Sequence, residues 1–256
     1  MELGGRVVVV TGGTRGVGAG IARSFLTAGA EVVVCARRPP REPVAAAGRA
    51  ASFTALDLRD QAAVRDFFGA VAARHGRLDC LVNNAGGTPY RRLGEGEAER
   101  HARVVELNLL APLTASLAAY PWLRESRGSV VMIGSVSGTR PSPGTAAYGA
   151  AKAGLENLAR SMAVEWAPRV RVNSLVLGMV RTELAHLHYG DEAGIAAVGA
   201  TVPLGRLAEP SEVGEAAVFL ASDRAGYVSG ASLLLHGGGE RPAFLDAATV
   251  NQDEES

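Results

Sequence analysis

The sequence predicts an α/β fold in which one doubly wound, parallel sheet of about seven strands carries helices on both faces. Three observations predict it. Strand-like and helix-like runs alternate along the chain. Several of the strand-like runs are apolar on both faces, as parallel strands covered by helices are. A glycine-rich turn follows the first of these runs and leads directly into a helix-like segment.

We expect a single domain over residues 1–245. Its strands are predicted at residues 6–11, 31–35, 52–57, 79–83, 129–134, 170–176 and 231–235. Its helices are predicted at residues 16–28, 60–75, 97–124, 146–167 and 211–222. Residues 36–50 are too broken by Pro, Ala and Arg for a full helix. Small and apolar residues at about 183–202 interrupt the alternation and predict a substrate lid, and the polar segment 246–256 predicts a frayed tail.

The composition narrows the class of protein. Lys+Arg and Asp+Glu balance at 26 each, which gives no reason to expect binding to nucleic acid or to an anionic membrane surface. No apolar run approaches the ~20 residues of a membrane span, and we expect no secretory signal and a cytoplasmic location. The two cysteines, Cys35 and Cys80, lie in strand-like runs and are expected to be buried rather than to form a redox pair.

The stretch from Val130 to Arg160 predicts the chemistry. A helix-like segment places Tyr148 and Lys152 four residues apart, on one helix face. A cation beside the phenol is expected to lower the pKa of Tyr148 from about 10 toward working pH. Ser135, at the end of the preceding strand, could share a substrate oxygen with that phenol. Taken alone, a Tyr and a Lys at this spacing also occur on many helices by chance.

The first strand leads into TGGTRGVG, where Gly12, Gly16 and Gly18 occupy the turn before a helix. Glycines at such a turn let the backbone approach a pyrophosphate, which then rests on the helix N-terminus. The spacing is GxxxGxG rather than GxGxxG, but the same physics applies. The alternative is a glycine turn that simply ends a strand. The position between strand and helix favours a dinucleotide-binding (Rossmann) sheet.

With these motifs, the chain resembles the short-chain dehydrogenase/reductase family over nearly its whole length, and most of all its β-ketoacyl-carrier-protein-reductase-like branch. The resemblance rests on several motifs that occur in the family's order. They are TGGTRGVG (11–18), Asp57, NNAG (83–86), Asn108, Ser135, Tyr148-x-x-x-Lys152 and residues 203–230.

The resemblance implies catalytic roles for four residues. Tyr148 would be the general acid/base, and Lys152 would tune the pKa of Tyr148 and hold the nicotinamide ribose. Ser135 would bind the substrate oxygen, and Asn108 would hold a water that relays protons. Pro112 has no N–H to donate, so the carbonyl of Asn108 is predicted to lack its helical partner and to be able to hold that water.

The resemblance also implies a cofactor site. Its expected members are Gly12, Thr14, Arg15, Gly16, Val17, Gly18, Arg37, Asp57, Leu58, Asn84, Ala85, Gly86, Tyr148, Lys152, Gly178, Val180 and Thr182. Asp57 would meet the adenine and Thr182 the phosphates. In the structural alternatives, Asp57 is a helix cap, NNAG is a plain turn and Asn108 lies at a helix interface.

Two positions depart from the family pattern. Leu177 precedes Gly178 where the family has proline, which frees that turn and leaves the carboxamide contacts less certain. His236 stands where an Asp is usual, and we expect a structural role for it at a strand end. His186 and His188 lie two residues apart without Cys or paired carboxylates nearby, so no metal site is expected.

The second strand indicates which cofactor is preferred. Ala36 occupies the position where an NAD enzyme carries an acid, so no carboxylate repels a 2′-phosphate. Arg37 follows, and Arg15 lies in the glycine turn; guanidinium groups bind phosphate through paired N–H donors. NADP(H) is therefore predicted to be preferred, with NAD(H) possible. The alternative is a solvated basic loop.

These features predict an NAD(P)H-dependent oxidoreductase that transfers a hydride between nicotinamide and a carbonyl or secondary alcohol. The alternative is a catalytically silent, redox-sensing regulator that binds a dinucleotide on the same fold. Apolar lid residues predict a mainly apolar substrate of the ketoacyl, polyketide, terpenoid or steroid type; they are Leu184, Leu187, Tyr189, Ile195 and Val198. The resemblance implies a homo-oligomer, a dimer or a homotetramer, paired through the helices near 97–124 and 146–167.

Overall fold

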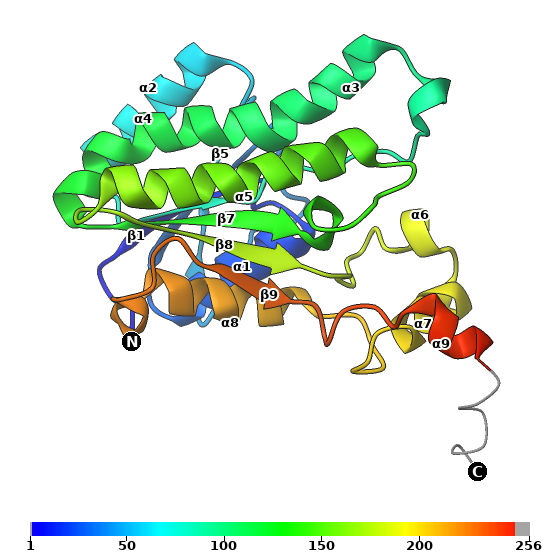
Figure 1. The fold of residues 1–256 in the computed structure, drawn as a ribbon. Helices are drawn as coiled ribbons and strands as arrows, with labels where there is room; N and C mark the ends of the chain where they lie inside the picture. Colours follow the sequence, from blue (N-terminus) through cyan, green and yellow to red (C-terminus); the bar gives the residue numbers. More distant parts are fainter. Residues whose placement is uncertain (1, 249–256) are drawn as a thin grey trace.

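The computed structural model describes residues 2–248 and confirms the predicted α/β fold (Figure 1). One seven-stranded sheet has the strand order β5-β2-β1-β6-β7-β8-β9, and every neighbouring pair is parallel. Each predicted strand is present, with ends shifted by at most two residues. The strands are β1 Val7–Thr11, β2 Glu31–Ala36, β5 Ser52–Ala55, β6 Cys80–Asn83, β7 Ser129–Ser135, β8 Arg171–Leu177 and β9 Ser232–Leu235.

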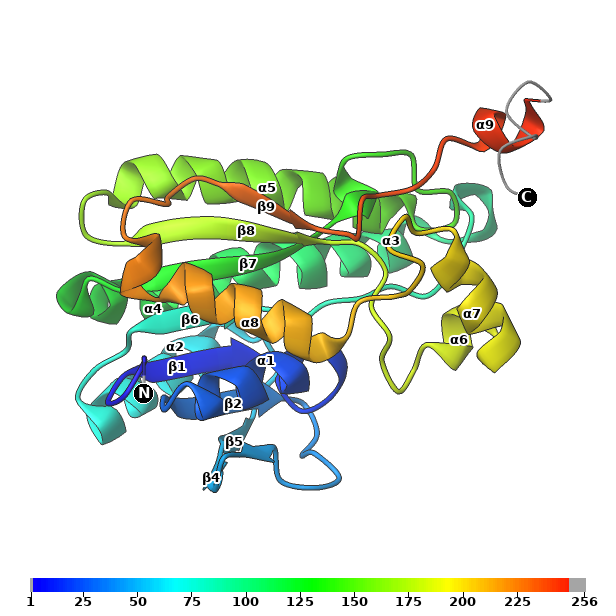
Figure 2. The same ribbon diagram turned by 90° about the horizontal axis from the view of Figure 1, so that it is seen from below.

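Helices cover both faces of the sheet, as Figures 1 and 2 show. Three of them pack on one face: α2 Gln61–His75, α4 Ala111–Ser126 and α5 Ala146–Trp166. Two pack on the other: α1 Gly16–Thr27 and α8 Pro210–Ala221. Each face has its own apolar core, and the consecutive β6 residues Leu81 and Val82 point into different ones. A strand buried on both sides therefore carries apolar residues on both faces, as Val7–Val10 of β1 do.

The helix predicted at 97–124 is interrupted by a π-turn. It consists of α3 Ala98–Val105, the π-turn η2 Glu106–Leu110 and α4. In the π-turn, the Ala111 N–H donates to the Glu106 carbonyl five residues back. Pro112 follows directly, so the irregularity lies where a helical donor is missing. By length and composition alone, the continuous helix Ala98–Ser126 could cross a membrane, as core helices of globular proteins also could; a third of its most apolar window is buried.

Several short elements were not predicted. A hairpin of β3 Ala45–Ala46 and β4 Arg49–Ala50 lies within the segment judged too broken for a helix. The lid region contains α6 His186–Tyr189 and α7 Glu192–Ala200. Helix α9 Ala243–Ala247 runs past the predicted domain end at 245, and residues 249–256 of the predicted tail lie outside the described residues. Three-residue 3₁₀ turns occur at η1 Leu93–Glu95, η3 Val136–Gly138 and η4 Asp223–Ala225.

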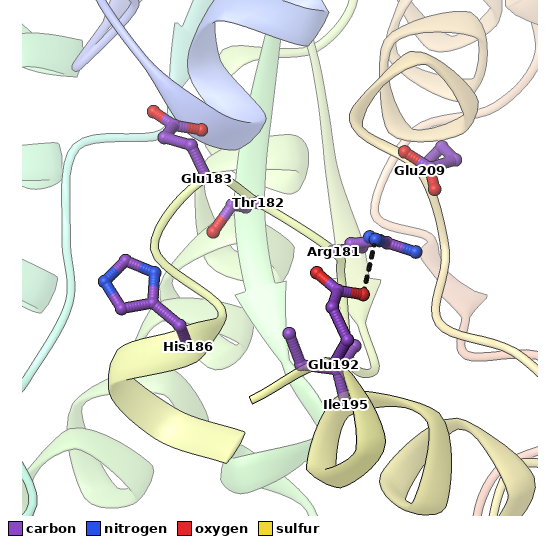
Figure 3. A pocket seen from close by; sticks show the side chains of 7 residues that line it. All are labelled: Arg181, Thr182, Glu183, His186, Glu192, Ile195 and Glu209. Carbon is purple, nitrogen blue, oxygen red and sulfur yellow. Dashed lines mark hydrogen bonds and ion pairs between the residues drawn. The ribbon is translucent and has the colours of Figure 1, made fainter. Parts of the chain in front are cut away.

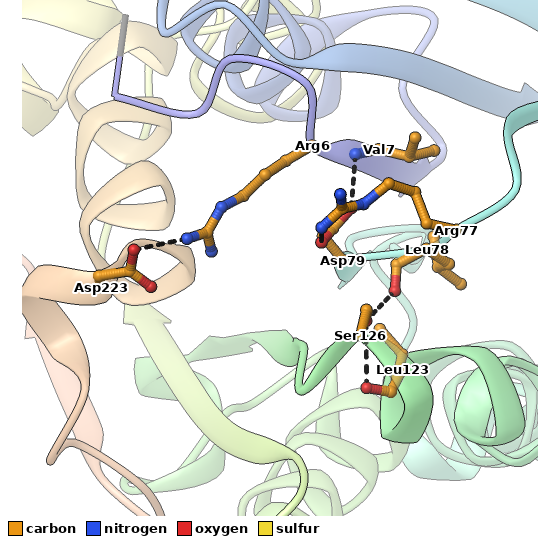
Figure 4. A network of polar contacts seen from close by, with 8 residues as sticks. All are labelled: Arg6, Val7, Arg77, Leu78, Asp79, Leu123, Ser126 and Asp223. Carbon is orange, nitrogen blue, oxygen red and sulfur yellow. Dashed lines mark hydrogen bonds and ion pairs between the residues drawn. The ribbon is translucent and has the colours of Figure 1, made fainter.

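A polar network fixes the amino-terminal edge of the sheet (Figure 4). The carboxylate of Asp79, which is 5% exposed, accepts hydrogen bonds from the Val7 N–H at 2.8 Å and from Arg77 Nε at 2.8 Å. These hydrogen bonds tie the start of β1 to the start of β6. They lie at the edge of the sheet opposite the carboxyl ends of the strands. Cys35 and Cys80 are both buried, as predicted, and they lie in different cores; burial raises the pKa of both thiols to about 12.

Candidate active site

The predicted site residues follow the carboxyl ends of four central strands. Because the sheet is parallel, these ends meet at one edge, where open α/β sheets bind their ligands. β1 leads into Gly12, β6 into Asn84, β7 ends at Ser135, and β8 leads into Gly178. Residues that are far apart in the sequence are thereby gathered at a single edge.

Helix α5 brings the predicted catalytic residues together. The Lys152 Nζ atom lies 5.5 Å from the centre of the Tyr148 ring, so the two side chains share a helix face as predicted. A side-chain hydrogen bond links Tyr148 to Ser135 at the end of β7. Lys152 is 3% exposed, and its ammonium group donates to the Ile133 carbonyl at 2.7 Å. The phenol therefore has both a hydroxyl and a buried cation as neighbours.

The expected pKa shift of Tyr148 has the wrong sign in this structure. Burial raises the pKa of Tyr148 above its usual value of about 10, and the hydrogen bond with Ser135 opposes that rise only in part. The lysine does not offset the burial, and burial in turn lowers the pKa of Lys152 to about 8. The phenol is thus kept protonated, which suits a proton donor to a carbonyl oxygen.

Asn108 is completely buried in the π-turn η2. Its side-chain oxygen accepts from the Gly87 N–H at 2.9 Å, and its amide donates to the Gly87 carbonyl at 3.0 Å. A Cβ on Gly86 would lie 2.5 Å from the Asn108 side-chain oxygen and 3.6 Å from Lys152 Nζ. The side chain therefore holds residues 86–87 against the lysine. The relay water on the Asn108 carbonyl stays a prediction.

The glycine turn is held by Thr11, which was not among the predicted site residues. The Thr11 hydroxyl accepts from the backbone N–H groups of Asn84 and Ala85, both at 3.0 Å. The Asn84 amide donates to the Thr11 carbonyl at 2.9 Å. Asn84 is thus part of a clamp between the β1 and β6 turns. The TGG and NNAG motifs contain these residues, but their 73-residue separation hides the contact.

The turn fits a dinucleotide. A Cβ on Gly18 would lie 2.3 Å from the Gly12 carbonyl oxygen, so the chain passes itself too closely for any side chain there. The N-cap residue of α1, Arg15, makes no side-chain cap, and the first turn of α1 carries no acidic residue. Gly16 opens the helix with φ +52°, and Thr14 and Val17 flank it. These features leave a helix N-terminus suited to a phosphate.

The predicted adenine end of the site carries a mixture of charges. Arg59 forms an ion pair with Asp57 at 2.6 Å, and this hydrogen bonding lowers the pKa of Asp57 to about 2, with a smaller contribution from Arg37. Asp57 is therefore ionised and already partnered, and Leu58 beside it is buried. Arg15 and Arg37 are exposed, and neither donates a side-chain hydrogen bond to another residue within 2–248.

The chain after β8 passes close to the end of β9. Gly178 donates its N–H to the Leu235 carbonyl at 2.9 Å, and a Cβ on Gly178 would lie 2.8 Å from His236 Cβ. Val180 forms a bridge with Ala208, which fixes the strand-like stretch before Thr182. His236 lies at a strand end as predicted. It also lines a cavity of about 280 Å³; the other lining residues are Val136, Thr139, Arg140, Gly178, Met179, Gly239 and Glu240.

The lid region 183–202 has its own small core. Ile195 packs with Ala185 and Leu207, and Tyr189 and Val198 pack against them. A second cavity, of about 330 Å³, lies between this region and the start of α8 (Figure 3); Arg181, Thr182, Glu183, His186, Glu192, Ile195 and Glu209 line it. Within the described part of the chain, no three His, Cys, Asp or Glu side chains gather closely enough to hold a metal ion.

The chain is similar to known oxidoreductases over most of its length. A family model described as Enoyl-(Acyl carrier protein) reductase matches residues 12–240. The L-fucose dehydrogenase of Oryctolagus cuniculus is 39% identical over 247 residues, covering 92% of this chain and 85% of that protein. The oxidoreductase UcpA of Escherichia coli O157:H7 is 34% identical, covering 94% and 97%. The solved structure of ligand-free aldohexose dehydrogenase (AldT) from Thermoplasma acidophilum has a TM-score of 0.87 at 29% identity, covering 93% and 94%.

Proposed function

Because the chain belongs to the short-chain dehydrogenase/reductase family, and because Ser135, Tyr148 and Lys152 meet beside the glycine turn, we propose that it is an NADP(H)-dependent enzyme acting at a secondary alcohol or carbonyl. The juxtaposition of a protonated phenol, a hydroxyl and a buried ammonium carries the proposal. A silent dinucleotide-binding regulator would not need this set, so we favour an enzyme.

Each residue is assigned a step. Tyr148 passes its proton to the substrate oxygen in reduction, and in oxidation the deprotonated phenol would accept the proton from the substrate hydroxyl. Ser135 donates a hydrogen bond to that oxygen. Lys152 places its ammonium group beside the Tyr148 phenol and would hold the nicotinamide ribose. Asn108 keeps residues 86–87 in place. A nicotinamide cofactor, when bound, would supply or accept the hydride.

We assign the preference for NADP(H) to Arg37 and Arg15. Arg59 already pairs with Asp57, which leaves the nearby Arg37 guanidinium available to a 2′-phosphate. The double variant Ala36→Asp with Arg37→Ala supplies a ribose acceptor and removes a phosphate donor, so it is expected to invert the kcat/KM preference toward NADH. Arg41→Ala, in the exposed loop beyond, is the control. Equal or better use of NADH by the unmodified enzyme would refute the assignment.

For the substrate, we favour a polyhydroxylated molecule such as an aldose. The cavity lined by Val136, the residue after Ser135, carries His236, Thr139 and the ion pair of Arg140 with Glu240 at 2.5 Å. These are hydrogen-bonding groups suited to hydroxyls, and two relatives are named as dehydrogenases of L-fucose and of aldohexoses. An apolar substrate has less support, because Ile195 and Val198 pack within the lid instead of lining this cavity.

A panel assay tests the function and the substrate class together. Aldoses, including L-fucose, are compared with apolar ketones and secondary alcohols, and the change in nicotinamide absorbance is followed. Turnover of one or more aldoses with little turnover of the apolar set is expected. Turnover confined to ketoacyl or steroid-type substrates would reverse the substrate assignment. Stoichiometric cofactor binding without turnover across the panel would favour the regulator.

We also propose a homo-oligomer paired through α4 and α5. The outer face of α5 carries a line of exposed residues, with Ala150, Ala153 and Asn157 at helical spacing and Val164 80% exposed. On α4, Leu117 is 57% exposed. Small residues on one helix and apolar ones on the next permit close packing of a second copy. A tetramer and a cytoplasmic location remain predictions.

A further inference from the structure

The carboxylate of Glu183 lies on the glycine turn. Its Oε1 atom accepts a hydrogen bond from the Gly16 N–H at 2.9 Å, although the two residues are 167 positions apart. Figure 3 shows the Glu183 side chain extending to the N-terminal end of α1, while Glu192, which lines the same cavity, pairs with Arg181. The lid region thus supplies an anion to a helix that has no capping side chain of its own.

That contact uses a donor expected to serve the cofactor. The exposed N–H groups at the start of α1 attract negative charge because they carry the positive end of the helix dipole. A dinucleotide phosphate in this turn would seek the same groups. A carboxylate that remained beside it would repel it, since both are anions. The two ligands therefore exclude one another at Gly16.

We propose that Glu183 is an internal competitor of the cofactor phosphates, which holds the start of the lid on the glycine turn in the free enzyme and is released when the dinucleotide binds. The inference rests on the proposed dinucleotide site. It links occupation of that site to the position of residues 183–202, so that substrate can be enclosed after cofactor has bound.

The surrounding contacts allow such a release. Before Glu183 the chain is fixed, because the Arg181 N–H donates to the Ala208 carbonyl at 2.8 Å and the Ala208 N–H to the Met179 carbonyl at 3.0 Å. Glu183 itself is exposed, and no Lys or Arg among residues 2–248 forms an ion pair with it. A single hydrogen bond to the backbone thus holds the carboxylate, and a multiply charged phosphate can displace it.

Cofactor affinity measured without substrate tests the competition. Dissociation constants for NADPH are obtained by fluorescence or calorimetry for the wild type, Glu183→Gln and Glu183→Ala. Removing the carboxylate is expected to lower the dissociation constant about two- to fivefold, the typical range for one charge at a helix N-terminus. Unchanged or weaker binding by both variants would overturn the proposal, because Glu183 would then be neutral or helpful in the bound state.

Glu192→Gln is the matched control. It removes one negative charge from the same cavity but leaves the Gly16 N–H untouched. Its dissociation constant is expected to stay within about twofold of the wild type. If Glu192→Gln and Glu183→Gln bound NADPH equally more tightly than the wild type, the total charge of the cavity, and not the contact with Gly16, would set the affinity. That result would overturn the proposal.

Lid protection in the free protein gives a second readout. Hydrogen exchange and limited proteolysis of residues 183–202 are expected to be faster in Glu183→Gln than in the wild type, and equal in the two once cofactor saturates them. Equal protection of residues 183–202 in the wild type and in Glu183→Gln without cofactor would contradict the proposal. If the wild type binds no dinucleotide at all, the proposed function fails, and the proposed role of Glu183 fails with it. If the wild type binds the dinucleotide but the Glu183 variants do not differ from it, only the proposed role of Glu183 fails.

Discussion

At the scale of single residues, burial governs the chemistry of the site. The ammonium group of Lys152 lies in the protein interior and donates to the Ile133 carbonyl, and burial lowers the pKa of Lys152 to about 8. Burial also keeps the phenol of Tyr148 protonated. In both cases the loss of water outweighs the neighbouring groups. The ligand-free site is therefore prepared to donate a proton.

The buried lysine predicts a pH dependence of stability. Its folded pKa of about 8 lies below its unfolded value, so the unfolded state binds more protons above pH 8. The free energy of unfolding of the wild type, relative to Lys152→Met, is expected to rise from pH 8 to about pH 10. The raised pKa values of both cysteines act equally on the two proteins and cancel. Urea unfolding at several pH values checks this, and a flat difference would contradict the burial of a titrating Lys152.

At the scale of elements, the turn from β1 into α1 shows how closely packed backbone shapes the site. Gly18 faces the Gly12 carbonyl and the Asn84 amide, and a Cβ there would lie 2.3 Å and 2.5 Å from their atoms. Thr11 pins the neighbouring turn through two backbone N–H groups. The ends of β1 and β6 and the start of α1 therefore form the expected phosphate site together.

Two glycine-to-alanine variants separate this packing from helix propensity. Gly18→Ala is expected to destabilise the protein by about 1–3 kcal/mol, because the turn must shift, and to weaken dinucleotide binding. Gly69→Ala lies within α2, where a Cβ would meet no atom within 4 Å. It is expected to stabilise by about 0.5–1 kcal/mol, since alanine favours the helix. Thermal unfolding measures both, and a stable Gly18→Ala variant that binds cofactor normally would disprove the close-approach argument.

The elements also show what the sequence could and could not predict. Continuous apolar runs identified β1 and β2 to within about one residue, because strands buried on both faces are mostly apolar. The prediction of β8 was equally close, although the strand contains the buried polar residues Asn173 and Ser174. The β3–β4 hairpin was missed because its two-residue strands depend on the positive φ angles of Ala47 and Gly48. The helices in the lid were hidden by its small residues.

Motif spacing predicted which site residues meet, but tertiary structure decided their state. Tyr148 and Lys152 share a face as their spacing requires. The direction of the Tyr148 pKa shift depends on burial, which four-residue spacing does not encode. The contact of Glu183 with Gly16 joins residues 167 positions apart, and no local pattern could reveal it.

At the scale of the whole molecule, the site occupies the carboxyl edge of the sheet and leaves the outer faces of α4 and α5 free to meet another copy. The wild type is expected to be a dimer or tetramer at micromolar concentration by light scattering. Ala153→Arg, which places a large charge on the exposed face of α5, is expected to lower that mass. Ala70→Arg, on the exposed face of α2, is the control and is expected to leave it unchanged. A monomeric wild type would contradict this assembly.

The central claim is that Tyr148 transfers the proton in a dinucleotide-dependent oxidation or reduction. The most direct test compares kcat and the cofactor dissociation constant of Tyr148→Phe with those of the wild type, on the best substrate of the panel. Tyr227→Phe, which changes a fully exposed phenol elsewhere, is the control. Loss of a positioned general acid predicts a fall in kcat of roughly two to four orders of magnitude, with cofactor affinity nearly unchanged. Retention of more than about a tenth of the wild-type kcat would contradict the account.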